Sequence, residues 1–179
     1  MQKNALILAG GKSQRFGEDK TLIKYGDHAT ITHFLFERLS EIFECVKVSA
    51  KNQKFNPPLP LLIDDFSEFC PLFVLANLDK TFNSPVFIIA ADMPFVAKST
   101  IETLLSNSHQ ICLAQDDENT HYLCGVFDPS VAKIARNLVQ NGEKRIKSLV
   151  QICDTKIIKF DDSKQFLNIN TKQDWEKVL

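Results

Sequence analysis

A short apolar strand that runs directly into two glycines constrains the fold of this chain most. Residues 5–9 (Ala-Leu-Ile-Leu-Ala) have the length and composition of a buried strand, and Gly10 and Gly11 end it. Three cations follow, at Lys12, Arg15 and Lys20. Open α/β sheets bind ligands beyond the carboxyl ends of their strands, and glycines let backbone N–H groups approach an anion. Because Lys and Arg add charge-assisted hydrogen bonds to phosphate oxygens, the stretch predicts a triphosphate-binding turn.

Two other phosphate-binding motifs do not fit this turn. A P-loop ends in Gly-Lys-Ser, as residues 11–13 do, but it also requires a glycine where Leu6 stands. The dinucleotide-binding fingerprint requires Gly-x-Gly-x-x-Gly, a spacing that Gly10, Gly11 and Gly17 do not give. The glycines by themselves leave open an ordinary strand-to-loop turn with solvated charges.

Apolar runs of strand length alternate with helical patterns along the rest of the chain. We expect strands at residues 45–50, 61–63, 86–91, 111–114 and 156–160, with 121–127 returning antiparallel to 111–114. We expect a short extended segment at 21–25, and helices beginning at Ile31, Pro71, Ser99 or Thr100, Asp128, Arg145 and Thr171. This alternation predicts an α/β fold, a three-layer α/β/α, Rossmann-like arrangement around a mostly parallel sheet. We find no repeat or linker, so residues 1–179 are expected to form a single domain.

Acidic residues follow two of the expected strands. Asp92 comes directly after the most apolar strand, and Asp64 and Asp65 follow the strand at 61–63. The loops after the strands that end at Ala9, Ile63 and Ala91 should meet at one edge of the sheet. Mg²⁺ commonly uses one or two carboxylates together with substrate phosphates, a role that suits Asp92. Asp is also a favoured turn residue, so a structural turn at each of these positions stays open.

The glycine turn resembles the signature loop of a known family. Residues 8–20 read Leu-Ala-Gly-Gly-Lys-Ser-x-Arg-Phe-Gly-x-Asp-Lys, which is similar to the loop of the nucleotidyltransferases that share the molybdenum cofactor guanylyltransferase fold. Similar stretches follow in order near 61–72, 91–95, 142–146 and 167–171. The resemblance implies a sheet of the nucleotide-diphospho-sugar transferase type. It also implies transfer of GMP from Mg-GTP to the terminal phosphate of molybdenum-molybdopterin.

The resemblance assigns roles residue by residue. It implies that Lys20, Asp92 and Arg15 are catalytic, with Lys20 neutralising the reacting α-phosphate, Arg15 reaching the outer phosphates and Asp92 holding Mg²⁺. It implies nucleotide binding by Leu8, Ala9, Gly10, Gly11, Lys20, Asp65 and Asp92. Lys144 and Arg145 resemble the segment that receives the second substrate, and residues 168–171 resemble the closing Asn-x-Asn-Thr. For Lys20, Lys144 and Arg145, a solvated surface charge is the alternative.

Two departures from the family pattern affect recognition of the base. Residues 70–74 read Cys-Pro-Leu-Phe-Val where the family often has Gly-Pro-Leu-x-Gly, and Ser49 stands where many members carry Asn. Neither departure changes the predicted reaction class, but both weaken the prediction that the nucleotide base is guanine. Three alternative functions stay open. The enzyme could use CTP with molybdopterin, or it could transfer a nucleotide to a sugar phosphate or a methylerythritol phosphate. The third alternative is a module that senses a nucleotide without turning it over.

Composition excludes several kinds of partner. The net charge of −1 gives no global attraction to nucleic acid or to an anionic membrane. No apolar run reaches the roughly 18 residues of a transmembrane helix, and the first residues lack the pattern of a secretory signal, so we expect a cytoplasmic protein. Five scattered cysteines predict buried thiols rather than disulfides or a zinc site. The resemblance implies protein partners of the molybdenum-insertion and molybdoenzyme-chaperone kind.

Overall fold

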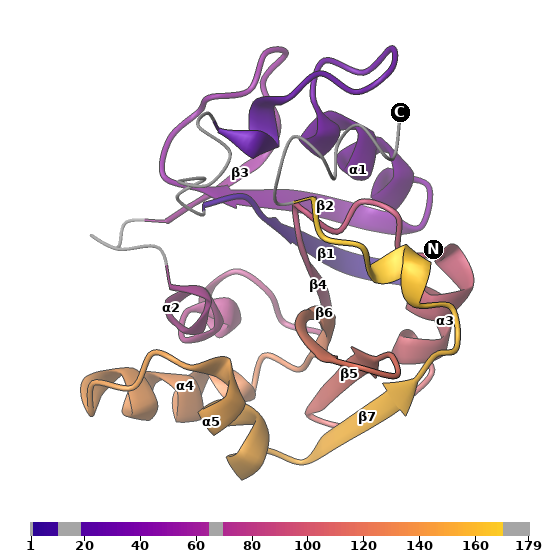
Figure 1. The fold of residues 1–179 in the computed structure, drawn as a ribbon. Helices are drawn as coiled ribbons and strands as arrows, with labels where there is room; N and C mark the ends of the chain where they lie inside the picture. The colour runs from indigo at the N-terminus through magenta and orange to yellow at the C-terminus, as the bar shows by residue number, and fades with distance from the viewer. Residues whose placement is uncertain (1, 11–18, 65–69, 170–179) are drawn as a thin grey trace.

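The computed structural model of the chain describes residues 2–10, 19–64 and 70–169. Its seven strands form one sheet in the order β3-β2-β1-β4-β6-β5-β7 (Figure 1). Their bounds are β1 Gln2–Leu8, β2 Phe43–Ala50, β3 Leu61–Ile63, β4 Val86–Ala90, β5 Ile111–Gln115, β6 Thr120–Phe127 and β7 Thr155–Lys159. Neighbouring strands are parallel except where β6 pairs with β4 and with β5. The predicted mostly parallel sheet is confirmed, and β6 is the expected antiparallel return.

Helices cover both faces of the sheet. α1 (Ile31–Ser40) and α3 (Lys98–Leu105) pack on one face, and α2 (Pro71–Leu75), α4 (Val131–Gln140) and α5 (Ile146–Ile152) pack on the other (Figure 1). Three short 3-10 helices are η1 (Lys20–Leu22), η2 (Leu78–Lys80) and η3 (Ser163–Phe166). Because strand side chains alternate, Ile7 packs in the cluster under α1 while Leu6 and Leu8 pack in the cluster under α2 and α4. The three-layer α/β/α prediction is confirmed.

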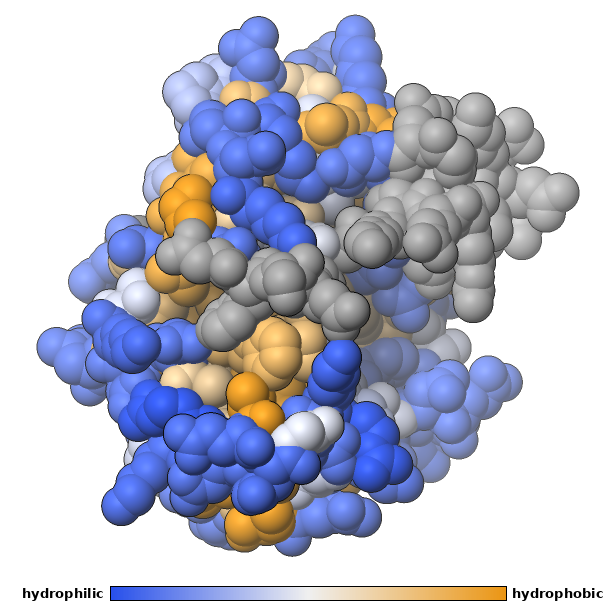
Figure 2. All heavy atoms as spheres, turned by 90° about the vertical axis from the view of Figure 1, so that its left-hand side faces the viewer, coloured by the Kyte–Doolittle hydropathy of each residue, from blue (hydrophilic) through white to orange (hydrophobic). Residues whose placement is uncertain are grey.

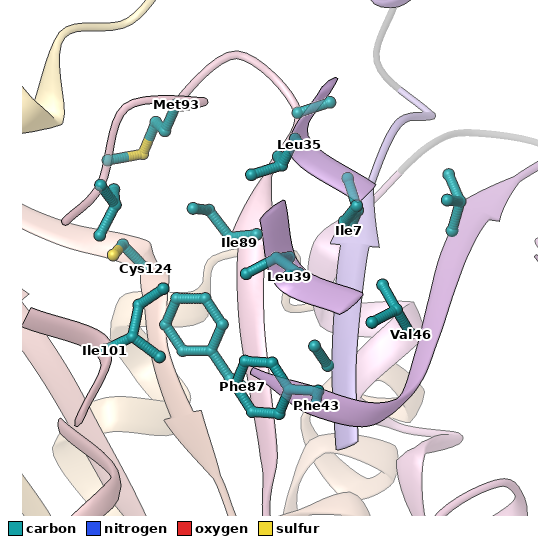
Figure 3. Packing of buried hydrophobic residues seen from close by; sticks show 14 of the residues in the cluster. Ile7, Leu35, Leu39, Phe43, Val46, Phe87, Ile89, Met93, Ile101 and Cys124 are labelled. Carbon is teal, nitrogen blue, oxygen red and sulfur yellow. The ribbon is translucent and has the colours of Figure 1, made fainter. Parts of the chain in front are cut away.

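An aromatic stack lies on the α1 face near the amino ends of β2 and β4. The rings of Phe43 in β2 and Phe87 in β4 lie parallel, with centroids 5.8 Å apart, across β1 (Figure 3). Leu35 and Leu39 of α1 are buried in the same cluster. Each fully buried side chain of this size stabilises the fold by about 1.5–3 kcal/mol. This packing holds β2, β1 and β4 together, so the positions of their carboxyl ends are fixed by the core.

A glycine in β6 permits close strand packing. The register between β5 and β6 shifts between Leu113 and Ala114. A Cβ atom at Gly125 would lie 2.4 Å from the carbonyl oxygen of Cys112, closer than any side chain tolerates. Gly125 is therefore required by the approach of the two backbones at this irregularity.

Three local expectations differ from the structure. The segment expected to be extended at 21–25 begins inside η1, because the carboxylate of Asp19 accepts hydrogen bonds from the backbone N–H and the hydroxyl of Thr21, and it is extended only from Ile23. The helix expected from Asp128 begins at Val131. Helix α3 begins at Lys98 after an N-cap at Ala97, earlier than the caps expected at Ser99 or Thr100. The expected helix beginning at Thr171 lies outside the described residues.

In the acidic turn at residues 116–119, Asp116 is buried while the other three residues are exposed. The side chain of Asp116 is only 8% exposed. It accepts the backbone N–H groups of Glu118 and Asn119 and lies 3.0 Å from Nε2 of His121. Burial by itself would raise the pKa of Asp116, but these hydrogen bonds outweigh burial and lower it.

The thiols and the helices agree with the compositional expectations. The five cysteines are free and all but Cys45 are buried, and burial raises the pKa of Cys124 to about 12. Among the described residues, no helix has both the length and the apolar character needed to cross a bilayer.

Candidate functional site

Three strand ends meet at one edge of the sheet. The N–H of Ala9, just after β1, donates to the carbonyl of Ser49 at 2.9 Å, and the N–H of Ala91, just after β4, donates to the carbonyl of Leu8 at 3.0 Å. The N–H of Asp64, after β3, donates to the carbonyl of Ala50 at 3.0 Å. The predicted meeting of these loops is therefore observed for the residues described. Figure 2 views the molecule from the side toward which β1 runs, and apolar side chains lie there between polar ones.

A cation and a carboxylate from distant parts of the chain face each other at this edge. Nζ of Lys20 donates to Oδ2 of Asp92 at 2.6 Å, although 72 residues separate them. Their side chains are 20% and 19% exposed. The pair therefore sits in a partly desolvated position, where its charges interact more strongly with an ionic ligand than they would in water.

The second carboxylate oxygen of Asp92 makes this position suited to a metal ion. Oδ1 is buried and has no hydrogen-bond partner among the described residues. A buried carboxylate oxygen without a donor is costly, and a hard cation is a suitable partner for it. The described part of the chain holds no group of three or more His, Cys, Asp or Glu side chains arranged around a metal position. The residues present thus fit Mg²⁺ held by one carboxylate, with substrate phosphates and water completing its shell.

The backbone around both side chains is held by several elements. Asp19 caps η1 and so fixes Lys20, while the hydroxyl of Thr32 in α1 donates to the carbonyl of Thr21 at 2.8 Å. On the other side, the N–H of Ile169 donates to the carbonyl of Asp92 at 2.9 Å. Arg38 of α1 donates to the carbonyls of Pro94 and Val96. The pair is therefore preorganised by contacts from α1 and from the segment after η3.

A small cavity lies between the carboxyl ends of β1 and β4. Its volume is about 100 Å³, and it is lined by Leu8, Ala9, Lys20, Thr21, Ala90, Ala91, Asp92 and Leu123. Leu8, Ala9, Lys20 and Asp92 were all predicted site residues, and the structure brings them together here. Gly10 follows Ala9 directly, whereas Gly11, Arg15 and Asp65 lie outside the described residues.

A second cavity lies on the same edge, toward α2. It measures about 400 Å³ and is lined by Ser49, Leu62, Ile63, Asp64, Val74, Asn77, Lys80 and Thr81. Asp64 is 6% exposed, so it is buried rather than solvated. Ser49, one of the two departures from the family pattern, lines this cavity.

A third cavity lies elsewhere and does not fit the predicted chemistry. It measures about 630 Å³ at the amino ends of the strands, where residues such as Asn4, Ser84 and His109 line it. Parallel α/β sheets bind their ligands at the opposite, carboxyl edge. The Lys20–Asp92 pair is at that carboxyl edge, so we place the candidate site there.

The segment expected to receive a second substrate is tied to the start of α2. Sγ of Cys70 donates to the carbonyl of Lys144 at 3.3 Å. The guanidinium of Arg145 is 79% exposed and pairs with Glu143 at 2.9 Å, and this pairing together with the Ser148 hydroxyl holds the pKa of Glu143 well below its usual range. The structure therefore joins two sequence features, Cys70 and residues 143–145, that sequence reasoning treated separately.

Only part of the closing motif falls within the described residues. Residues 167–169 have no regular secondary structure. Asn170 lies outside the described residues. The observed contribution is the hydrogen bond from Ile169 to Asp92, which no local pattern could have indicated because its partner is remote in sequence.

Known proteins resemble the chain in sequence and in fold. Residues 5–157 match the family of the MobA-like NTP transferase domain. The chain is 33% identical over 180 residues to a molybdenum cofactor guanylyltransferase of Campylobacter jejuni, covering 97% of this chain and 94% of the relative.

Two solved structures share the fold at lower identity. Molybdopterin-guanine dinucleotide biosynthesis protein A from Archaeoglobus fulgidus matches with a TM-score of 0.80 at 17% identity, over 97% of this chain and 95% of that one. A 2-C-methyl-D-erythritol 4-phosphate cytidylyltransferase from Thermus thermophilus matches with a TM-score of 0.73 at 14% identity, over 99% of this chain and 97% of that one. The scaffold is thus common to proteins named for different nucleotides.

Proposed function

The chain belongs to the MobA-like NTP transferase family and is a nucleotidyltransferase, and from that premise we propose that it transfers GMP from Mg-GTP to molybdenum-molybdopterin. An oxygen of the acceptor's terminal phosphate bonds to the α-phosphorus of GTP. The bond from that phosphorus to the oxygen bridging to the β-phosphate breaks, and pyrophosphate leaves with the electron pair. The products are molybdopterin guanine dinucleotide and pyrophosphate.

The observation that carries the proposal is the Lys20–Asp92 pair at the carboxyl edge, with Oδ1 of Asp92 buried and lacking a partner among the described residues. In phosphoryl transfer the protein acts mainly by positioning and by stabilising charge. In the proposed mechanism the ammonium of Lys20 moves from Asp92 to the α-phosphoryl oxygens, where negative charge grows. Asp92 would hold Mg²⁺, which when bound neutralises phosphate charge and orients the nucleotide.

The other proposed roles concern binding. Gly10 and Gly11 would present N–H donors to the triphosphate, and Leu8 and Ala9 would line the nucleotide site. Arg15 would contact the outer phosphates, and Asp65 would contact the nucleoside. Backbone N–H groups at a glycine turn after a strand form an anion-binding concavity, which supports this part of the proposal. A general base is not required, because the attacking phosphate is already an anion.

The first test is a calorimetric titration of the protein with GTP, CTP and ATP, each with and without Mg²⁺. We expect Mg²⁺-dependent binding that favours GTP, followed by pyrophosphate release when molybdenum-molybdopterin is added. Binding of none of the three nucleotides would overturn the proposed site. Nucleotide binding without pyrophosphate release under any acceptor would instead identify a nucleotide-sensing module.

Two positions that depart from the family pattern keep open a second candidate, the same reaction with CTP. Ser49 lines the 400 Å³ cavity beside α2, and a buried Cys70 rather than glycine precedes that helix. Both positions concern base recognition, so a preference for CTP in the titration would keep the reaction and change the product. Sugar phosphates and a methylerythritol phosphate are the acceptors to test if molybdopterin is not used.

The cellular part of the proposal follows from the resemblance. We place the reaction in the cytoplasm, with the product passed to molybdenum-insertion and molybdoenzyme-chaperone proteins. Capture of such proteins by the tagged enzyme when molybdopterin guanine dinucleotide is bound would test it, and capture that does not depend on the product would contradict it.

A further inference from the structure

A lysine outside the predicted site residues contacts the chain on both sides of the glycine turn. Lys54 lies in the loop between β2 and β3, and its Nζ donates to the carbonyl of Ala9 at 2.9 Å and to Oδ2 of Asp19 at 2.6 Å. We propose that Lys54 is a positioning residue that holds Lys20 opposite Asp92 by fixing Asp19. This inference rests on the proposed function for its kinetic consequence, and its structural consequence can be measured without turnover.

Asp19 transmits the effect of Lys54 to Lys20. Its Oδ2 accepts from Lys54, while its Oδ1 accepts from the N–H of Thr21 at 3.1 Å and from the Thr21 hydroxyl at 2.7 Å. Both carboxylate oxygens are therefore engaged, and the carboxylate is the N-cap of η1, which Lys20 begins. Burial by itself would raise the pKa of Asp19, but the hydrogen bonds from Lys54 and Thr21 outweigh it and lower the pKa. Asp19 is thus a charged cap whose orientation depends on Lys54.

The loop that carries Lys54 is itself anchored to α1. Phe55 is 4% exposed, its ring lies edge-on to His33 with centroids 6.0 Å apart, and Nζ of Lys54 lies 5.5 Å from the Phe55 ring centroid. Nε2 of His33 lies 2.8 Å from the carbonyl of Pro57, and its Nδ1 lies 2.8 Å from the hydroxyl of Thr30. An ammonium held by a carboxylate, a carbonyl and an aromatic face has little conformational freedom. Lys54 therefore joins η1 to a fixed part of the fold.

The partner of Lys54, rather than its exposure or its distance from a carboxylate, distinguishes it from Lys20. Both lysine side chains are 20% exposed, and each Nζ lies 2.6 Å from a carboxylate oxygen. Lys20 pairs with Asp92, the residue proposed to hold the metal, whereas Lys54 pairs with a capping carboxylate. The two lysines therefore have different proposed roles. Lys20 contacts the substrate, and Lys54 orients η1, the element that carries Lys20.

The test that needs no turnover measures how readily Lys20 reacts. The full chain, without nucleotide, is treated with an amine-reactive acylating reagent, and labelling of Lys20 is followed by mass spectrometry. Lys54→Met should raise the labelling rate of Lys20 several-fold, because a freed η1 lets its ammonium leave Asp92. Asp19→Asn, which keeps the shape of the cap and removes the charged partner of Lys54, should do the same. Lys24→Met, at an exposed lysine of the same segment, should leave the rate unchanged.

The kinetic test separates positioning from general destabilisation. With pyrophosphate release as the assay, Lys54→Met should lower kcat by about tenfold to a hundredfold, the cost of a misplaced catalytic group, with KM for Mg-GTP nearly unchanged. In a Lys20→Ala background the same substitution should add less than about threefold, because the group it positions is already gone. The inference would be overturned if Lys54→Met lowered kcat by the same factor in the Lys20→Ala background as in the unaltered protein. It would also be overturned if the labelling rate of Lys20 were unchanged in both Lys54→Met and Asp19→Asn. If the wild-type protein releases no pyrophosphate, the proposed function fails, and the labelling comparison still decides the role of Lys54.

Discussion

Replacing Asp92 with Asn removes one charge from the candidate site and keeps its shape. In the structure Oδ2 of Asp92 accepts from Lys20 at 2.6 Å, and Oδ1 is buried with no hydrogen-bond partner among the described residues. The amide can keep its oxygen toward Lys20 and place its NH₂ group where Oδ1 was. A partly exposed ion pair contributes about 1 kcal/mol or less, so we expect a small loss of stability. For a chain of this length, that loss lowers Tm by roughly 4 °C at most.

Turnover should respond far more strongly than stability. The amide cannot supply the negative oxygen proposed to hold Mg²⁺, and losing one preorganised electrostatic contact to a transition state costs about 10²–10³ in kcat, or about 3–4 kcal/mol. The assay is pyrophosphate release from Mg-GTP with the acceptor present, with Tm measured in parallel. Calorimetry with GTP should show that Mg²⁺ strengthens nucleotide binding much less in Asp92→Asn than in the unaltered protein.

The contrast with a matched control makes this prediction refutable. Asp27→Asn changes an exposed acid in the loop before α1 and should leave both turnover and Mg²⁺ dependence unaltered. Asp92→Asn with turnover within threefold of the unaltered protein, and with the same Mg²⁺ dependence, would refute the assignment of Asp92. A loss of turnover matched by a collapse of Tm would refute the claim that its role is chemical.

Three further substitutions test other parts of the structure. Lys20→Ala should lower turnover by about a hundredfold or more, about 3 kcal/mol, in the same pyrophosphate assay at saturating nucleotide, and near-normal turnover would count against it. Gly125→Ala places a Cβ 2.4 Å from the carbonyl of Cys112, so overpacking should cost about 1–3 kcal/mol and lower Tm by roughly 2–12 °C; an unchanged Tm would contradict the strand packing. The pKa of Asp116 is lowered by folding, so its stabilisation is present above its unfolded pKa of about 3.9 and lost as pH falls through the lower folded value. Asp116→Asn should therefore be less stable than the unaltered protein at pH 7 in chemical denaturation, and the difference should shrink in acid; a constant difference would rule this out.

Much of the architecture was predictable because it is encoded locally. Strand and helix periods follow from which side chains must face the core, and they indicated the seven strands, the antiparallel return at β6 and the helices on both faces. The Lys20–Asp92 site could also be predicted from the sequence, although the two residues are distant along the chain. Parallel strands bring their carboxyl ends to one edge, so an acid after β4 and a glycine turn after β1 had to be neighbours.

Local patterns failed where a carboxylate makes several hydrogen bonds, even though its partners are only two to five residues away. Asp116 looked like an exposed turn residue, yet it is buried against His121 and backbone N–H groups. The extended segment expected at 21–25 begins in η1, because the carboxylate of Asp19 caps that helix. Polarity predicts exposure only on average, because a buried charge is stable wherever hydrogen bonds replace its hydration.

By itself, the sequence determined the alternation of apolar segments, the glycine turn and the acid after the central strand, because each is a property of a few adjacent residues. Only the tertiary structure decided that Oδ1 of Asp92 is buried without a described partner, that Ile169 anchors the backbone of Asp92, and that Lys54 joins Ala9 to Asp19. Those contacts depend on the exact distance and direction between segments that the core packs together. No pattern along the chain specifies such distances, because they arise from the packing of all the layers at once.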